Sequence, residues 1–192
     1  MKAYKGFNAD LTCTRGNGRF QYEIGKTYKE NEAKCAHNGF HCVEEPIEVL
    51  RWYSGSDARY CLVEASGDVN EDGDDKISCT EMTILKEMTL EQLATLECLW
   101  MKEHPEREYS RQVYRNKGYA DESDRIVIVR GKSPKAAGDI GTTIFLVKGT
   151  AKGVSSIGIY KIDGKDYKPG IYYKVDGRMA DAKKRTAKAK SA

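Results

Sequence analysis

The sequence lacks the apolar run of about 20 residues that a membrane-spanning helix needs, because charged and polar residues interrupt every hydrophobic stretch. Its first ten residues, MKAYKGFNAD, contain no apolar segment of the kind found in secretory signal peptides. We therefore expect a cytoplasmic protein that does not contact membranes.

Several signatures of enzymes are also missing. The sequence contains no P-loop, no G-x-G-x-x-G, no G-x-S-x-G nucleophile elbow and no H-E-x-x-H zinc motif. None of the six cysteines forms a C-x-x-C pair, so we expect most of them to be reduced and to act as small apolar core residues. The absence of a complete catalytic set favours a binding function over an enzymatic one.

What the sequence does contain is typical of a globular protein. Of its 192 residues, 40% are hydrophobic and 32% are charged, which is enough apolar material for a core. The net charge of +3 is unevenly distributed, since residues 177–192 carry six Lys or Arg and one Asp. The C-terminus is therefore a basic tail on a nearly neutral body.

Hydrophobic periodicity predicts an α+β fold. Alternating segments indicate a mixed, mainly antiparallel sheet, and two short helices are expected, one after Pro46 and one after Thr89, where Thr89 and Gln92 form a capping box. The expected order is an N-terminal α+β domain (1–104), a charged connector (105–124), a small antiparallel β region (125–178) and the basic tail (179–192), which we expect to be disordered.

Four sequence blocks carry a family resemblance. They are YKGFNADLTC (4–13), GFHCVEEPIEVLRWY (39–53), DDKISCTEMTILKE (74–87) and IGIYKIDGKDYKPGIYYKVDGR (157–178). Together they resemble a family of phage and prophage proteins known as a domain of unknown function. The resemblance implies a phage or prophage origin, hence a lysogenic or infected bacterial cell, but it transfers no activity.

Two segments have some of the residues of a metal site. Cys35, His37 and His41 offer zinc ligands, but the neighbours His41 and Cys42 point to opposite faces of an extended strand, so a core role for Cys42 is the simpler interpretation. Asp68, Asn70 and Asp72, followed later by Glu81, partly match a calcium loop whose end arrives two residues late. A solvated acidic hairpin explains this segment equally well, and neither metal is favoured.

The order of the elements is also similar to that of ADP-ribosyltransferases. Those enzymes begin with an aromatic-(Arg/His)-Gly strand, which corresponds to Tyr4-Lys5-Gly6 here. A Gly-aromatic segment with a later tyrosine and a glutamate on a central strand would correspond to His41, Tyr53 and Glu81. This resemblance implies NAD as the cofactor, held by Lys5, with Glu81 stabilising the developing cation.

Three functional hypotheses follow. The first is a non-enzymatic phage accessory protein that binds a host or phage macromolecule, and the second is the NAD-dependent transferase. The third is nucleic-acid binding through the basic tail, whose cations are Arg178, Lys183, Lys184, Arg185, Lys188 and Lys190. A merely solubilising tail is the simpler alternative to the third hypothesis, because no aromatic residues are interleaved with these cations.

Overall fold

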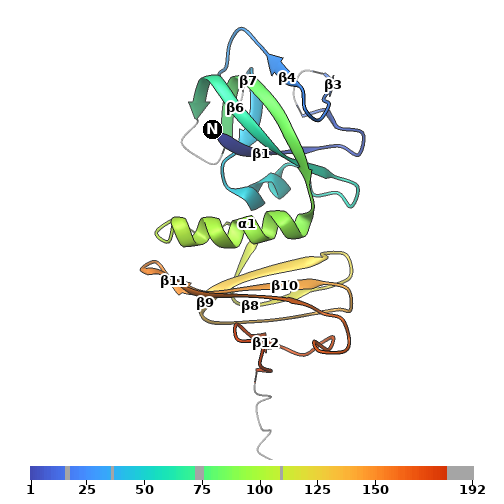
Figure 1. Ribbon diagram of the computed structural model, residues 1–192, viewed down its shortest axis with the longest axis vertical. Coiled ribbons are helices and arrows are strands. Elements are labelled where there is room, and N and C mark those ends of the chain that lie inside the picture. The colour runs from blue at the N-terminus through green and yellow to red at the C-terminus, as the bar shows by residue number, and fades with distance from the viewer. Residues whose placement is uncertain (16–17, 36, 72–75, 109, 181–192) are drawn as a thin grey trace, which may run out of the picture.

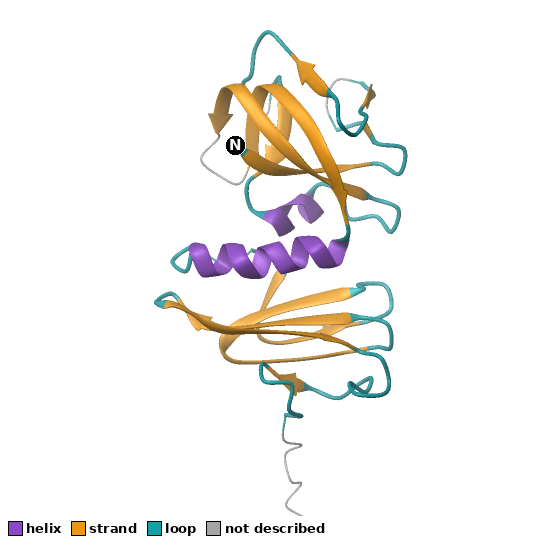
Figure 2. Cartoon of the chain, viewed as in Figure 1, coloured by secondary structure: helices purple, strands orange, loops and turns teal. Residues whose placement is uncertain are grey.

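The computed structural model describes residues 1–15, 18–35, 37–71, 76–108 and 110–180. Two bodies built from strands lie at opposite ends of the molecule, and helix α1 (Leu90–Glu103) lies between them (Figures 1 and 2). No helix in the described part of the chain is long and apolar enough to cross a membrane.

The N-terminal body is a small closed barrel. Its walls are β1 (Lys2–Phe7), β5 (Phe40–Val43), β6 (Arg59–Glu71) and β7 (Lys76–Met88). β1 pairs with β5 and β6, and β7 pairs with the same two strands, so the ring has no open edge. Alternate residues face its interior, where Phe7, Cys42, Cys61, Val63, Cys79, Met82 and Ile84 form the core.

Three short strands complete this body. β4 (Thr27–Lys29) pairs with residues 81–83 of β7, next to residues 76–79, with which β5 pairs. β2 (Thr12–Cys13) and β3 (Phe20–Gln21) form a separate hairpin. Phe20 and Tyr22 pack edge-to-face against Tyr28 and Phe40, so this hairpin is attached to the barrel by aromatic contacts.

Helix α1 packs against both bodies. Leu93 belongs to an apolar cluster that also contains Val43 and Tyr60 of the barrel. Ala94, Cys98 and Met101 belong to another cluster, together with buried side chains of the C-terminal body. The helix begins at the expected capping box, since Thr89 Oγ1 accepts from Gln92 N and Gln92 Oε1 accepts from Thr89 N.

The C-terminal body consists of five strands. They are β8 (Val113–Ala120), β9 (Ile126–Gly138), β10 (Thr143–Thr150), β11 (Gly153–Lys161) and β12 (Tyr173–Lys174). β8, β9 and β10 pair in parallel, so that Val113 lies beside Ile128 and Ile128 lies beside Phe145. The chain therefore winds as a coil in which each turn places a strand beside the strand of the turn before. β11 pairs antiparallel with β10 and covers that edge of the coil.

The predicted α+β class is wrong. Among the described residues, strands make up 50% and helices 12%, so the fold is mainly β. The expected first helix is only the 3-10 helix η1 (Pro46–Arg51), because the apolar stretch between Pro46 and Ser54-Gly55 is too short to sustain an α-helix.

The expected arrangement of the C-terminal half differs as well. The region expected to be small and antiparallel contains parallel pairs, and β8 lies inside the segment expected as a charged connector (105–124). The parallel strands are joined by turns at 121–125 and 139–142 in place of helices. Connections this short can join parallel strands because β8 is bent. The bend is at Asn116, which has a φ of 62° and lies beside Gly131 of β9.

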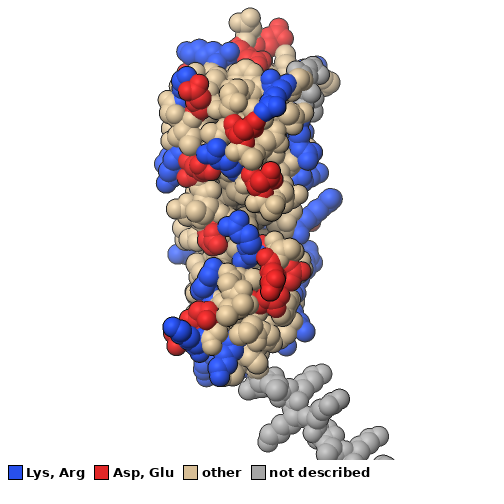
Figure 3. All heavy atoms as spheres, turned by 90° about the vertical axis from the view of Figure 1, so that its right-hand side faces the viewer, with Lys and Arg blue, Asp and Glu red and all other residues tan. Residues whose placement is uncertain are grey.

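Charges of both signs are mixed on the surface. On the face seen in Figure 3, Lys and Arg alternate with Asp and Glu over both bodies, and no single-sign patch dominates that face. A partner that is recognised by its charge on this face must therefore bind at a local group of charged residues and not to the face as a whole.

Candidate functional site

A cavity of about 580 Å³ opens at the side of the barrel between the β2–β3 hairpin and η1. Three segments supply half of its lining residues: β1, β5 and the residues from Val49 to Tyr53. The lining combines aromatic and cationic side chains, which are Tyr4, Phe20, Tyr22, Phe40, Trp52, Tyr53, Lys5, Arg15 and Lys76. This volume is within the range of small-molecule binding sites.

Lys5 is the most unusual residue of the cavity wall. Its side chain lies on the same face of β1 as Ala3 and Phe7, it is only 8% exposed, and it enters the barrel interior. Nζ donates to the carbonyl oxygen of His41 at 2.6 Å and lies 5.3 Å and 5.7 Å from the ring centroids of Tyr22 and Phe7. No carboxylate of the described residues forms an ion pair with it.

His41 reaches the cavity from β5, directly after a tight turn. Gly39 adopts a φ of 84°, and Ser78 Oγ donates to the carbonyl oxygen of Asn38 at 2.6 Å. A Cβ at Gly39 would lie 2.5 Å from Ser78 Oγ, so glycine is needed there both for the turn and for close packing. The turn places the His41 carbonyl within reach of Lys5.

Tyr53 and Trp52 form the wall on the side of η1. The Tyr53 ring packs against β1 so closely that a Cβ at Gly6 would lie 2.7 Å from Tyr53 Cδ2. Its buried hydroxyl and the buried Nε1 of Trp52 make no hydrogen bond of ordinary geometry with the described residues. Burial, followed by the neighbouring Cys13 thiol, raises the pKa of Tyr53, so its hydroxyl is a donor at neutral pH.

Two buried thiols lie near Lys5. Cys42 and Cys79 share a hydrogen bond that raises the pKa of the Cys42 thiol and lowers that of Cys79. The positive charge of Lys5 favours the thiolate of each cysteine, but the pKa of Cys42 is still raised because its hydrogen bond with Cys79 and its burial are larger effects. All six cysteines are free thiols, and Cys42, Cys61 and Cys79 belong to the barrel core, in agreement with the predicted packing role.

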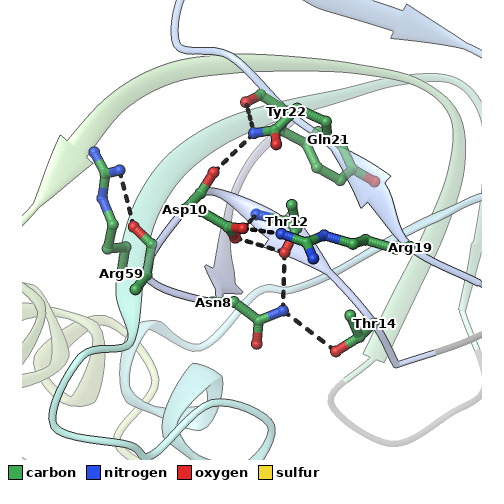
Figure 4. Close-up of polar contacts among 9 residues, drawn as sticks. Asn8, Asp10, Thr12, Thr14, Arg19, Gln21, Tyr22 and Arg59 are labelled. Carbon is green, nitrogen blue, oxygen red and sulfur yellow. Dashed lines mark hydrogen bonds and ion pairs between the residues drawn. The ribbon is translucent and has the colours of Figure 1, made fainter.

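A polar network fixes the hairpin that closes the cavity (Figure 4). Asp10 accepts from Thr12 N at 3.1 Å and Thr12 Oγ1 at 2.6 Å, and it also forms an ion pair with Arg19. These contacts lower the pKa of Asp10, with the Thr12 hydroxyl as the main cause. Gln21 Nε2 donates to the Asp10 carbonyl, which connects β3 to the same network.

The four residues of the transferase hypothesis do not share one cavity. Lys5, His41 and Tyr53 line it, whereas Glu81 does not and pairs with Lys29 at 3.0 Å. The reason is a change of phase along β7. Ile77 and Cys79 face the core, but beyond an irregularity opposite Ser66 and Val69 the core residues are Met82 and Ile84.

The zinc candidates are not brought together. Cys35 is buried and its Sγ donates to the Lys76 carbonyl at 3.5 Å, while His37 is exposed. Among the residues that the structure describes, no group of three or more His, Cys, Asp or Glu could hold a metal ion.

The calcium candidates that the structure describes, Asp68, Asn70 and Glu81, are in strands and not in a loop. Asp68 and Asn70 belong to strand β6, where Asp68 N donates to Thr80 Oγ1 and Asn70 Oδ1 accepts from Cys35 N. Asp72 lies outside the described residues.

Of the tail cations, Arg178 is the one inside the described range. It donates to the Asp176 carboxylate at 2.6 Å and 2.8 Å. Lys183, Lys184, Arg185, Lys188 and Lys190 lie outside the described residues.

Sequence reasoning missed several residues of the cavity. Arg15 stacks 5.6 Å from the Tyr53 ring centroid, and Lys76 lies 4.5 Å from that of Trp52. These residues are distant in the sequence and match no motif. One residue of the sequence does point to the cavity. Lys5 stands between Ala3 and Phe7 in an alternating strand, at an interior position where an apolar residue is expected.

Comparison with known proteins places the N-terminal part of the chain. No curated protein and no solved structure matches it. A family described as "Domain of unknown function (DUF7666)" matches residues 1–96, which include the whole barrel, η1 and the first half of α1. Because this match spans half of the sequence, the chain belongs to the family of this domain of unknown function.

Proposed function

We propose that the chain is a non-enzymatic accessory protein that binds a host or phage macromolecule through the barrel cavity. The observation that carries this proposal is the buried Lys5 ammonium at the cavity wall, with one carbonyl partner and no carboxylate among the described residues. A buried charge is costly unless it is paired, so an anionic group of a partner would complete the site. The phage or prophage origin depends on the sequence blocks alone.

Affinity capture from host lysate tests the proposal. The unmodified protein and the Lys29→Met variant should retain one stoichiometric partner, and Lys5→Met should lose it. Lys29 is the matched control because it is exposed on β4 and outside the cavity lining. Capture of no stoichiometric partner, or equal capture by Lys5→Met, would contradict the proposal.

The transferase hypothesis receives less support. Its favourable observation is that Lys5, His41 and Tyr53 line one cavity. However, the carboxylate that would stabilise the developing cation is Glu81, which lies outside this lining. A thermal shift on adding NAD that is abolished in Lys5→Met, together with a modification of lysate proteins lost in Glu81→Ala, would revive it.

Nucleic-acid binding through the tail stays a prediction. If the tail binds, affinity should fall steeply with salt and disappear on deletion of residues 179–192. Binding that persists after this deletion would assign it to another surface.

A further inference from the structure

Resting on the proposed function, we infer that the cavity binds a phosphate monoester carried on an organic body. The inference depends on four properties of the cavity: its charge balance, its unsatisfied donors, the fixed position of its cations and its size. Each property restricts the class of ligand.

The charges in the lining favour a dianion. Lys5, Arg15 and Lys76 line the cavity, and Glu30 is the acidic residue among the described lining residues. The net charge of these four lining residues is thus about +2. A phosphate monoester carries about −1.5 to −2 at pH 7, whereas a single carboxylate carries only one negative charge.

The unsatisfied polar groups are mainly donors. Lys5 Nζ uses one of its protons on the His41 carbonyl, and the Trp52 indole and Tyr53 hydroxyl have no partner of ordinary geometry among the described residues, while Asn38 Oδ1 is an acceptor of the lining in the same state. These donors outnumber that acceptor, so they match a ligand that is rich in acceptor oxygens. A phosphate monoester offers three terminal oxygens, one more than a carboxylate.

The outer cations are held in place before any ligand arrives. Arg15 stacks on Tyr53 and Lys76 on Trp52, so each cation is positioned by a ring that also lines the cavity. Preorganised charges lose less conformational entropy when they bind. Both cations line the same cavity as Lys5.

The volume requires more than a bare phosphate. A cavity of about 580 Å³ is of the size that holds a whole small molecule. Its apolar wall consists of Val43, Val49, Phe20 and Tyr22, which suits an apolar or aromatic body attached to the phosphate. The source is either a phosphorylated side chain of a partner protein or a free small-molecule phosphate, since both present the same group.

Isothermal titration calorimetry with three probes tests this inference at pH 7.5. Phenyl phosphate combines the dianion with a ring, benzoate has the ring with one charge, and inorganic phosphate has the charge without the ring. Phenyl phosphate should bind at least about tenfold more tightly than either, because each of the others lacks one of the two features. Benzoate binding as tightly as phenyl phosphate would overturn the phosphate assignment and leave the proposed anion site intact.

Variants locate the site. Lys5→Met should weaken phenyl phosphate by about tenfold or more, and Lys29→Met should leave the affinity unchanged. If Lys5→Met does not fold, Arg15→Gln and Lys76→Gln replace it, each with a smaller expected loss. An affinity that none of these substitutions changes would overturn the inference, as would the failure of all three probes to bind, whereas the capture experiment judges the proposed function separately.

A peptide arm identifies the source of the phosphate. A short phosphotyrosine peptide that binds more tightly than phenyl phosphate, while its unphosphorylated form does not bind, supports the assignment and points to a partner protein. A peptide that binds more weakly than phenyl phosphate also supports it and points to a small molecule. Equal binding of both peptide forms would overturn the assignment.

Discussion

Lys5 places a charge inside a barrel whose interior is otherwise mostly apolar. Because folding must remove this ammonium from water, it should cost stability in the free protein. We predict that Lys5→Met raises the stability of the free protein by about 1 kcal/mol, or about 2–4 °C in melting temperature for a chain of this size. Differential scanning calorimetry measures the change.

The matched substitution for this prediction is Lys29→Met. Lys29 is exposed and pairs with Glu81 on the surface, so its loss should change the melting temperature by less than about 1 °C. A Lys5→Met protein that is less stable than the unmodified chain would show that Lys5 serves the fold and not a ligand.

Glu97 is the buried carboxyl that faces η1. It is fully buried in α1, its Oε2 accepts from Ile47 N, and burial, with the neighbouring Glu45 and Glu48, raises its pKa. A carboxyl whose pKa is raised on folding binds its proton more tightly in the folded state. Stability should therefore fall as pH rises from about 4.5, its ordinary value, through the raised pKa.

We predict that Glu97→Gln removes this pH-dependent loss. The amide keeps the acceptor for Ile47 N but cannot ionise, so the variant should melt at a higher temperature than the unmodified chain at pH 8 and at a similar one at pH 4. Glu103→Gln, on the exposed end of the same helix, is the control and should leave the pH profile unchanged. Parallel profiles for Glu97→Gln and the unmodified chain would refute the role of Glu97.

At the scale of elements, the N-terminus of α1 depends on one hydroxyl. Thr89 Oγ1 accepts from Gln92 N, and Thr89→Ala removes that acceptor. We predict a loss of about 1 kcal/mol in the free energy of unfolding, measured by urea denaturation. Thr89→Ser keeps the hydroxyl and should lose only a small part of this, whereas an equal loss in both variants would mean that the methyl group matters and the cap does not.

The β2–β3 hairpin depends on Asp10. Asp10→Ala removes the acceptor for Thr12 N and Oγ1, and the ion pair with Arg19. We predict faster hydrogen exchange at the amide of Tyr22, which donates to the Leu11 carbonyl, with no change at Ile84 in the barrel wall. Asp57→Ala, an exposed aspartate outside this network, is the control. Unchanged exchange at Tyr22 would mean that aromatic packing alone holds the hairpin.

Elements with local signals were predictable, and those that depend on distant pairing were not. The capping box at Thr89 and the turn at Gly39 follow from residues a few positions apart, and both are present. The side of β7 that Glu81 occupies depends on an irregularity opposite β6, which no alternation within β7 reveals. The parallel coil was missed because it depends on the pairing of separate strands, such as Ile126 with Thr143 and Val127 with Ile144, which no pattern within one strand reveals.

At the scale of the whole molecule, α1 serves two cores. The barrel packs on its Leu93 side and the C-terminal coil on its Ala94, Cys98 and Met101 side. The division at residue 104 into separate domains stays a prediction. Shared packing on one helix implies that loss of either body exposes apolar surface of the other.

Coupled unfolding is therefore expected of the intact chain. Phe145 is fully buried in the coil, in the cluster that contains Ala94 and Cys98, so Phe145→Ala should cost about 3–5 kcal/mol. Each tryptophan can report on unfolding alone when the other one is replaced by Phe. Trp52 lies beside the cavity and Trp100 lies in α1. We predict that Phe145→Ala lowers the unfolding midpoint of both reporters equally.

Ile140→Ala is the matched control, because Ile140 is 60% exposed on the same body and should change the free energy of unfolding by less than about 0.5 kcal/mol. If Phe145→Ala shifts only the Trp100 signal and leaves Trp52 at its original midpoint, the two bodies unfold independently. The barrel with its cavity would then be a domain in its own right. Coincident shifts would instead make α1 the element through which mutations in the coil reach the cavity.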